Sequence, residues 1–391
     1  MKLLAGLSLL ASVVSGLSVA REDHGALALA KRGADCPIAP KVMIISMFLY
    51  EDLWPAALNL THNVTIPGLS PLFPNVKCNE AKDICRIVTG ESEINAACTV
   101  TALMLSPEFN LTQSYFFIAG IAGINPFKGT LGSVGLARFA VQVALAYEVD
   151  ARQIPDGWTT GYWLQGTDKP GDPVNYDNVY GTEVFELNTN LRDTVFGYLD
   201  GVKLNDSSDA QAFRANYDYA PANQSPQIFY GDVATSDVYF AGSLLSETFG
   251  NITLQWTNNT GEYALTAQED NASMEAMVRA DKAGLMDFSR VILMRTASDI
   301  DRAPANMTTI DAFEADQGGF EISLQNILIA GGPIISGIID HWDSTFSAGI
   351  TPQANWSYTA DAFHTLASMK KREFSEKKRA QRRNTRLFSR K

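Results

Sequence analysis

The feature that most constrains the fold is an alternation of short apolar runs with longer amphipathic stretches, which begins at Lys41. Short apolar runs predict buried strands, and the longer stretches predict helices that cover them. We expect strands at 41–49, 114–123 and 289–299, helices at 95–106, 187–199, 271–285 and 312–339, and a helix followed by a strand within 131–149. The alternation predicts the α/β class, with a mostly parallel or mixed central sheet flanked by helices, in one domain over residues 33–368.

The N-terminal residues lie outside this alternation. Residues 1–20 join one lysine, a short apolar run and a small-residue ending, which together predict a secretory signal peptide. Residues 21–32 end in the dibasic pair Lys31-Arg32, which predicts a pro-segment removed by a processing protease. The alternative is an ordinary exposed Lys-Arg pair that no protease recognises. We therefore expect a mature chain that begins near Gly33 and is secreted or held at the cell surface.

Charge is unevenly distributed along the chain. The net charge is −12, yet the segment 369–391 holds eleven of the 31 lysines and arginines. The remaining body is strongly acidic, which argues against a nucleic-acid polymer as a partner. The tail itself predicts a disordered basic extension that contacts anionic surfaces or is trimmed by proteases.

Sequons and cysteines agree with a secretory route. Ten asparagines stand in N-x-S/T: Asn59, Asn63, Asn110, Asn205, Asn223, Asn251, Asn258, Asn271, Asn306 and Asn355. The four cysteines are Cys36, Cys78, Cys85 and Cys98, and an even number in an oxidising compartment predicts two disulfides. Three connectivities are open, with Cys78 and Cys85 a plausible local pair. No histidine or cysteine cluster has metal-ligand spacing, so no bound metal is expected.

One apolar stretch, 322–339, is long enough to raise the question of a membrane span. Gln325, Asn326 and the Gly331-Gly332-Pro333 break interrupt it. We therefore expect a buried helix followed by a turn, and no transmembrane span in the mature chain.

Several strands end in residues suited to ligand binding. After the strand at 114–123, Gly120 and Gly123 would let a ligand approach the backbone and leave N–H groups free for an anion, although such glycines are often packing devices. The strand at 289–299 delivers Asp299 to its C-terminal end, where α/β proteins place their chemistry. An Asp at that place is also a common N-cap of the next helix, and both readings stay open.

Taken in order, six elements resemble the nucleoside phosphorylase and nucleosidase superfamily. They are "KVMIISMFLYED", "TGESEINAA", "FFIAGIAG", "GDVATSDVYFAG", "NASMEA" and "RTASD". The leader and the blocks "GTEVFELNTNLRD" and "TAQEDNASMEAM" are similar to the fungal purine nucleoside permease family. The resemblance implies a nucleoside phosphorylase-like fold and purine nucleosides as ligands.

The resemblance also implies roles for single residues. Asp299 matches the acid that protonates the purine ring, and Glu275 with Met274 matches the pair that holds the sugar. Ser236 and Asp237 match an element near the base pocket. Glu51 stands near the place of a water-activating glutamate.

Phosphate use is in doubt, because phosphorylases of the superfamily carry Ser or Thr in the glycine turn where this chain has Ile121. Phosphate is therefore only a possible co-substrate, and no other cofactor is expected. An acid at the base and a carboxylate by the sugar are sufficient for breaking an N-glycosidic bond.

Our leading hypothesis is a protein that binds purine nucleosides and cleaves their N-glycosidic bond, by hydrolysis rather than phosphorolysis. The alternative is a nucleoside-binding or transport component that delivers intact nucleosides, and a third reading is a binding protein that has lost catalysis. The enzyme hypothesis requires Asp299, Glu275 and Glu51 to line one cleft. An oligomer is possible.

Overall fold

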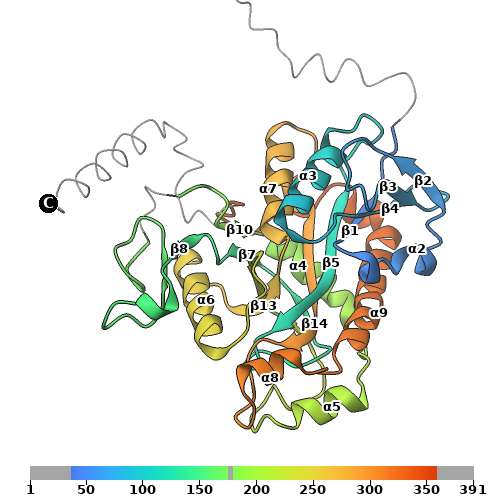
Figure 1. Cartoon of the computed structure of the whole chain (residues 1–391). Coiled ribbons are helices and arrows are strands. Elements are labelled where there is room, and N and C mark those ends of the chain that lie inside the picture. The colour runs from blue at the N-terminus through green and yellow to red at the C-terminus, as the bar shows by residue number, and fades with distance from the viewer. Residues whose placement is uncertain (1–36, 175–178, 359–391) are drawn as a thin grey trace, which may run out of the picture. The chain divides into compact units, whose positions relative to one another are not determined.

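The computed structural model describes residues 37–174 and 179–358 (Figure 1). The expected signal peptide, pro-segment and basic tail lie outside the described residues. The limits of the expected domain, 33–368, also lie outside them and stay a prediction.

A mixed sheet forms the centre of the described residues. Its strands are β1 (Val42–Ser46), β2 (His62–Thr65), β3 (Asn75–Cys78), β4 (Ile84–Val88), β5 (Tyr115–Ile124), β6 (Val134–Leu136), β7 (Phe139–Gln142), β10 (Val184–Glu186), β11 (Ile228–Tyr230), β12 (Asp232–Thr235), β13 (Tyr263–Ala267) and β14 (Val291–Ile300). β1 pairs in parallel with β4 and β5, and β5 pairs in parallel with β14. Antiparallel pairs occur at β2 with β3 and at β7 with β10. The predicted α/β class with a mixed sheet is confirmed.

Helices cover both faces of this sheet (Figure 1). They are α2 (Trp54–Ala57), α3 (Ser92–Leu105), α4 (Thr189–Phe196), α5 (Ser208–Arg214), α6 (Ser243–Trp256), α7 (Asp270–Lys282), α8 (Thr309–Glu314) and α9 (Phe320–Asp340). Among the short 3₁₀ helices, η1 (Leu49–Glu51) follows β1. A separate hairpin joins β8 (Ala146–Glu148) and β9 (Tyr162–Leu164).

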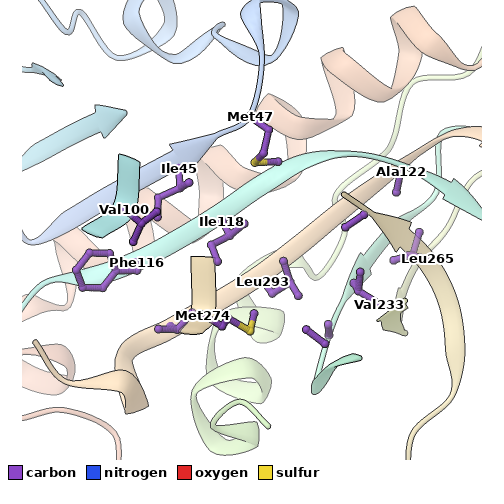
Figure 2. Packing of buried hydrophobic residues seen from close by; sticks show 14 of the residues in the cluster. Ile45, Met47, Val100, Phe116, Ile118, Ala122, Val233, Leu265, Met274 and Leu293 are labelled. Atoms are coloured by element: carbon purple, nitrogen blue, oxygen red, sulfur yellow. The ribbon is translucent and has the colours of Figure 1, made fainter. Parts of the chain in front are cut away.

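Successive side chains of a buried strand point to opposite faces of the sheet, so each strand contributes to two hydrophobic cores. On β1, Met43 and Ile45 belong to the core under α3 and α7, whereas Val42 and Ile44 belong to the core under α4 and α9. Figure 2 shows the first core, in which Ile45 lies among side chains from the strands and from α3 and α7. Strands that are buried on both faces are near-continuously apolar, which is why the sequence pattern identified them.

Residues 131–149 differ from the expectation of a helix and a strand. They form the short strands β6, β7 and β8, and no helix. The segment begins with Leu131 and Gly132, where the backbone has φ +80°, and continues through Ser133 and Gly135, so residues with low helix propensity occupy its first turn. Its alternating valines fit a pleated strand better than a helix.

α9 is the one helix of the described residues that is long and apolar enough to cross a membrane, and 61% of its apolar window is buried in the fold. The expected burial is confirmed. The expected turn at Gly331-Gly332-Pro333 is wrong, because the helix continues through Pro333 to Asp340. Packing of α9 against the core keeps the helix continuous, even though Pro333 has no N–H to donate to the carbonyl of Ile329.

Two of the cysteines form a disulfide, and one sequon asparagine is buried. Cys78 and Cys85 form the expected local disulfide between β3 and β4. Cys98 is free and exposed on α3, and Cys36 lies outside the described residues, so the second expected disulfide is not formed by Cys98 here. Asn271 is buried in α7 and donates to the Thr182 carbonyl at 2.9 Å, so this sequon cannot carry a glycan in the folded chain.

A prediction follows from the packing of α9. A β-carbon on Gly331 would lie 2.6 Å from Cη2 of Trp54 and 2.9 Å from Cε1 of Phe117, whereas one on Gly332 meets nothing within 4 Å. Gly331→Ala should lower the free energy of unfolding by about 1–3 kcal/mol through overpacking. Gly332→Ala, the matched control, should be neutral or stabilising by about 0.5–1 kcal/mol. Urea unfolding of both variants checks this, and equal stability of the two would contradict the packing described.

Candidate functional site

A cavity of about 480 Å³ opens where β1, β5, β12, β13 and β14 end. This volume is in the range of small-ligand sites, and strand ends are where α/β folds bind ligands. The polar lining includes residues that lie in these strands or just after them: Glu51, Ser236, Thr266, Glu269, Arg295, Ser298 and Asp299. Aromatic side chains of Phe48, Tyr239, Phe240, Phe313 and Phe320 supply the apolar wall. The cavity therefore combines ring-sized apolar surface with several carboxylates.

Glu51 is fixed in this cavity by backbone hydrogen bonds. η1 returns its side chain over the end of the sheet, where Oε2 accepts from the Met47 N–H at 2.7 Å and Oε1 accepts from the Ile121 N–H at 2.8 Å. Gly120 makes this approach possible, since a β-carbon there would lie 2.5 Å from Oε1. Burial raises the pKa of Glu51 to about 7, against the opposing effect of Arg295.

Arg295 lies behind Glu51 as a buried hub. Its guanidinium donates to Asp270 at 2.5 and 3.2 Å, to Glu269 at 3.2 Å and to the Ile121 carbonyl at 2.9 Å. Burial raises the pKa of Glu269, and the nearby positive charge of Arg295 opposes this shift without cancelling it. With Glu51 nearby, three carboxylates face one guanidinium, so the group carries net negative charge when all are ionised.

Asp299 lines the cavity from β14. Ala297 pairs with Ala122 and Asp299 pairs with Gly123, so Ser298 is the extra residue of a β-bulge that sets the direction of the acid. Oδ2 of Asp299 lies beside Gly123, where a β-carbon would be 3.0 Å away. Burial raises the pKa of Asp299, while hydrogen bonds from Ser298 and Tyr239 oppose the shift.

Ser298 holds one oxygen of Asp299. Its hydroxyl donates to Oδ1 of Asp299 at 2.6 Å and lies 3.0 Å from the Ala122 carbonyl oxygen, a second acceptor. Oδ1 is therefore already an acceptor, and the oxygen left to carry a proton is Oδ2, which lies beside Gly123.

Other candidates from the sequence lie elsewhere. Met274 is buried in the core under α7, and Glu275 accepts from Arg279 at 2.7 Å on the outer side of the same helix; neither lines the cavity. Helical spacing explains this. α7 begins at Asp270, and each residue turns by about 100° around the helix axis, so Glu275 lies on a different side of the helix from Asp270. The structure therefore brings Glu51 and Asp299 into one cavity but not Glu275, so the requirement that all three carboxyl groups line one cleft is not met; a role of Glu275 and Met274 at a sugar stays a prediction.

Ser236 and Asp237 are separated by the structure. Ser236 lines the cavity, and its hydroxyl oxygen accepts from the Val238 N–H at 3.1 Å. Asp237 faces the N-terminus of α3, where Oδ1 accepts from the Ser92 hydroxyl at 2.9 Å and the Glu93 N–H at 2.8 Å. Asp237 thus caps a helix, a favourable place for a carboxylate.

The glycines of β5 do not leave the anion site that the sequence suggested. The Ile121 N–H donates to Glu51, and the Gly123 N–H donates to Oγ1 of Thr266 at 2.8 Å. Gly120 and Gly123 instead allow the side chains of Glu51 and Asp299 to approach the strand.

Sequence reasoning missed Glu269, Thr266 and Arg295 as site residues. Glu269 is the second residue after the end of β13, so the strand-end rule that selected Asp299 also points to it. The motif "SMEA" drew the choice to a glutamate six positions later. Among residues 37–174 and 179–358, no group of three or more His, Cys, Asp or Glu is arranged to hold a metal ion.

Comparisons with known proteins add a family. The family model described as "Purine nucleoside permease (NUP)" matches residues 39–351. A purine nucleoside permease of Candida albicans is 44% identical over 334 residues, covering 84% of this chain and 81% of that protein. A probable purine nucleoside permease of Schizosaccharomyces pombe is 38% identical over 346 residues, covering 86% of this chain and 98% of that protein.

Solved structures with some likeness are nucleosidases and a hydrolase. The 5'-methylthioadenosine/S-adenosylhomocysteine nucleosidase of Neisseria meningitidis has 13% identity and a TM-score of 0.45, covering 77% of this chain and 99% of that chain. Futalosine hydrolase of Helicobacter pylori has 14% identity and a TM-score of 0.44, covering 75% and 97%. No conclusion is drawn from likeness at this level. The match of the family model and the identity to the two fungal proteins show that this chain belongs to the purine nucleoside permease family.

Proposed function

We propose that this protein binds purine nucleosides in the cavity and cleaves their N-glycosidic bond by hydrolysis. The observation that carries the proposal is that Glu51 and Asp299, two carboxyl groups with raised pKa, line the same cavity. Glu51 lies beside Gly120, and Asp299 lies beside Gly123, three residues further along β5, so the acid and the base border the same cavity at different points.

Each group has a task that its environment favours. A protonated Asp299 gives its proton to the departing purine, which would otherwise leave as an anion. Ionised Glu51 takes a proton from the attacking water. Glu269 and the net negative charge around Arg295 stabilise the positive charge that develops on the sugar as the bond breaks.

Hydrolysis fits the cavity better than phosphorolysis. The N–H groups of Ile121 and Gly123 are already bonded to side chains, as described above. Both arginines that line the cavity are paired, Arg295 with Glu269 and Asp270, and Arg302 with Asp301. A phosphate would therefore meet several carboxylates without gaining a free cation.

The relatives' name suggests a second candidate, a component that binds nucleosides and delivers them intact. The proposal accommodates transport indirectly: if the predicted signal peptide directs the chain outside the cell, cleavage there supplies free base for uptake. Incubation of the purified protein with inosine and adenosine, with and without phosphate, separates the candidates by chromatography. Base released without phosphate supports hydrolysis, and release only with phosphate would make the protein a phosphorylase. Intact nucleoside with saturable binding would favour the delivery component.

Removal of the acid gives a direct prediction. Asp299→Asn keeps the shape of the side chain but cannot donate a carboxylic proton, so kcat should fall by at least about 100-fold with a smaller change in KM. Steady-state kinetics on inosine measures both constants. Activity within a few fold of the original chain would show that Asp299 is not the acid.

Glu269 and Glu275 provide a matched pair of variants, because only Glu269 lines the cavity. Glu269→Gln should lower kcat/KM by about tenfold or more, because it removes a carboxylate that lines the cavity and is proposed to stabilise positive charge on the sugar. Glu275→Gln changes only a partly exposed pair with Arg279 and should stay within about twofold. The reverse order of effects would restore the role that the motif "SMEA" implied.

The raised pKa of Glu51 predicts a pH dependence. Only the ionised carboxylate accepts a proton, so kcat/KM should fall about tenfold per pH unit below a pKa of about 7. Asp299 must be protonated, so a second decline is expected towards alkaline pH. A pH–rate profile tests both limbs. Glu51→Gln should lose most hydrolysis, and a profile that is flat from pH 5 to 8 in the unaltered protein would contradict the assignment.

A further inference from the structure

The turn η1 carries the proposed base, Glu51, yet little of its remaining surface is buried. Leu49 and Tyr50 are 64% and 60% exposed, whereas Glu51 is 1% exposed. Tyr50 adds one edge-on ring contact with Phe320, 5.7 Å between centroids. Apolar side chains that stay in water gain little from the hydrophobic effect. Polar contacts therefore have to contribute much of the attachment of this turn to the sheet.

Asp52, the residue after Glu51, makes such a contact. Its carboxylate forms an ion pair with the guanidinium of Arg86 on β4, and the two side chains are 13% and 3% exposed. The residues beside Arg86 in the sheet register are Ile44 of β1 and Lys77 of β3. Because a second positive charge lies next to it, Arg86 requires a carboxylate as its partner. The pair therefore fastens the end of η1 to an interior strand of the sheet.

A buried ion pair of this kind is better suited to fixing a position than to adding stability. Replacement of both partners by apolar residues is often neutral or stabilising, because both charges lose their water on folding. The planar guanidinium, however, binds a carboxylate in a defined orientation. Residue 52 is joined to Glu51 by one peptide unit, so a shift of residue 52 moves the Glu51 carboxylate away from the Met47 and Ile121 N–H groups.

We propose that Arg86 is a positioning residue for the hydrolysis: by binding Asp52, it fixes η1 so that the carboxylate of Glu51 faces the attacking water. The inference rests on the proposed function, because it concerns the group that serves there as the base. Neither Arg86 nor Asp52 is among the residues that line the cavity, so Arg86 acts through Asp52 and η1. Loss of the pair should loosen η1 and let bulk water reach Glu51.

Direct charge effects do not connect the pair to Glu51. The charged groups that shift the pKa of Glu51 are Arg295, on β14, and Glu269, just after β13. Asp52 and Arg86 carry opposite charges, so their joint replacement by neutral residues leaves the net charge unchanged. A changed pKa of Glu51 in such a double variant would therefore report a change in its burial.

The test removes the pair without leaving a buried charge. Asp52→Leu with Arg86→Met replaces both partners by apolar side chains, and Asp52→Asn with Arg86→Gln replaces them by neutral hydrogen-bonding groups. Asp206→Leu with Arg214→Met is the matched control. That pair is also mostly buried, with side chains 20% and 6% exposed, and neither residue lines the cavity. Thermal unfolding shows which of these proteins are folded.

Steady-state kinetics as a function of pH gives the first readout. In each folded double variant of Asp52 and Arg86, kcat should fall by about tenfold or more with a smaller change in KM, because the base is misplaced. The decline of kcat/KM on the acid side should move to lower pH, because water around Glu51 lowers its raised pKa. A protein that is only less stable loses activity by the same factor at every pH and keeps the position of this decline.

Three results would overturn the inference. The first is an unchanged kcat and acid decline in a folded double variant of Asp52 and Arg86. The second is an equal loss in the control variant of Asp206 and Arg214. The third is failure of both Asp52 and Arg86 double variants to fold, which would assign the pair to the stability of the fold.

Titration of Glu51 separates this inference from the proposed function. Carbon-13 NMR of protein labelled at its glutamate carboxyl groups, with Glu51→Gln to assign the signal, gives the pKa of Glu51 without any substrate. If nucleosides stay intact while this pKa is lower in the double variants of Asp52 and Arg86, the enzyme proposal fails and the placement of Glu51 by Arg86 is kept. If cleavage proceeds while neither this pKa nor kcat responds to the pair, Arg86 is not a positioning residue and the enzyme proposal stands.

Discussion

The arrangement of the site depends on the buried positive charge of Arg295, which neighbouring carboxylates neutralise. Arg295 is 2% exposed and comes from the central strand β14, so its guanidinium has no access to bulk water. A buried charge that loses its partner costs about 3–5 kcal/mol, which makes Glu269 and Asp270 obligatory neighbours. Because these two residues begin α7, the ion cluster fixes the start of that helix against the sheet. The same cluster determines how many negative charges the cavity can hold.

Three carboxyl groups share one arginine, and they are therefore compensated to different extents. Asp270 is bonded twice to Arg295 and takes most of its charge compensation. Glu51 meets the same guanidinium only at longer range and is otherwise surrounded by apolar groups and two N–H donors, so burial dominates its pKa. One arginine therefore lies beside both a fully paired carboxylate and a carboxyl group whose pKa is about 7, which is the condition for acid and base chemistry near neutral pH.

Sequence patterns predicted the parts of this structure that depend on local physics. The two-faced burial of β1, β5 and β14 appears as continuous apolar runs, and the rule that strands end at the site selected Asp299. What the patterns missed depends on tertiary contacts. Pro333 remains helical because α9 is packed into a core, and residues 131–149 are extended because neighbouring strands complete their hydrogen bonds. The motif pointed to Glu275 although Glu269 is the glutamate that lines the cavity, because motif similarity does not fix which turn of a helix meets the sheet.

The attachment of Glu51 to the backbone of residue 121 has an evolutionary consequence. Glu51 binds the N–H of Ile121, and every residue except proline supplies that group. The side chain at this position therefore takes no part in holding Glu51 and can vary without breaking that hydrogen bond. A lineage can exchange a hydroxyl residue for isoleucine here, reshaping the pocket, without disturbing the carboxylate that lies against the same peptide unit.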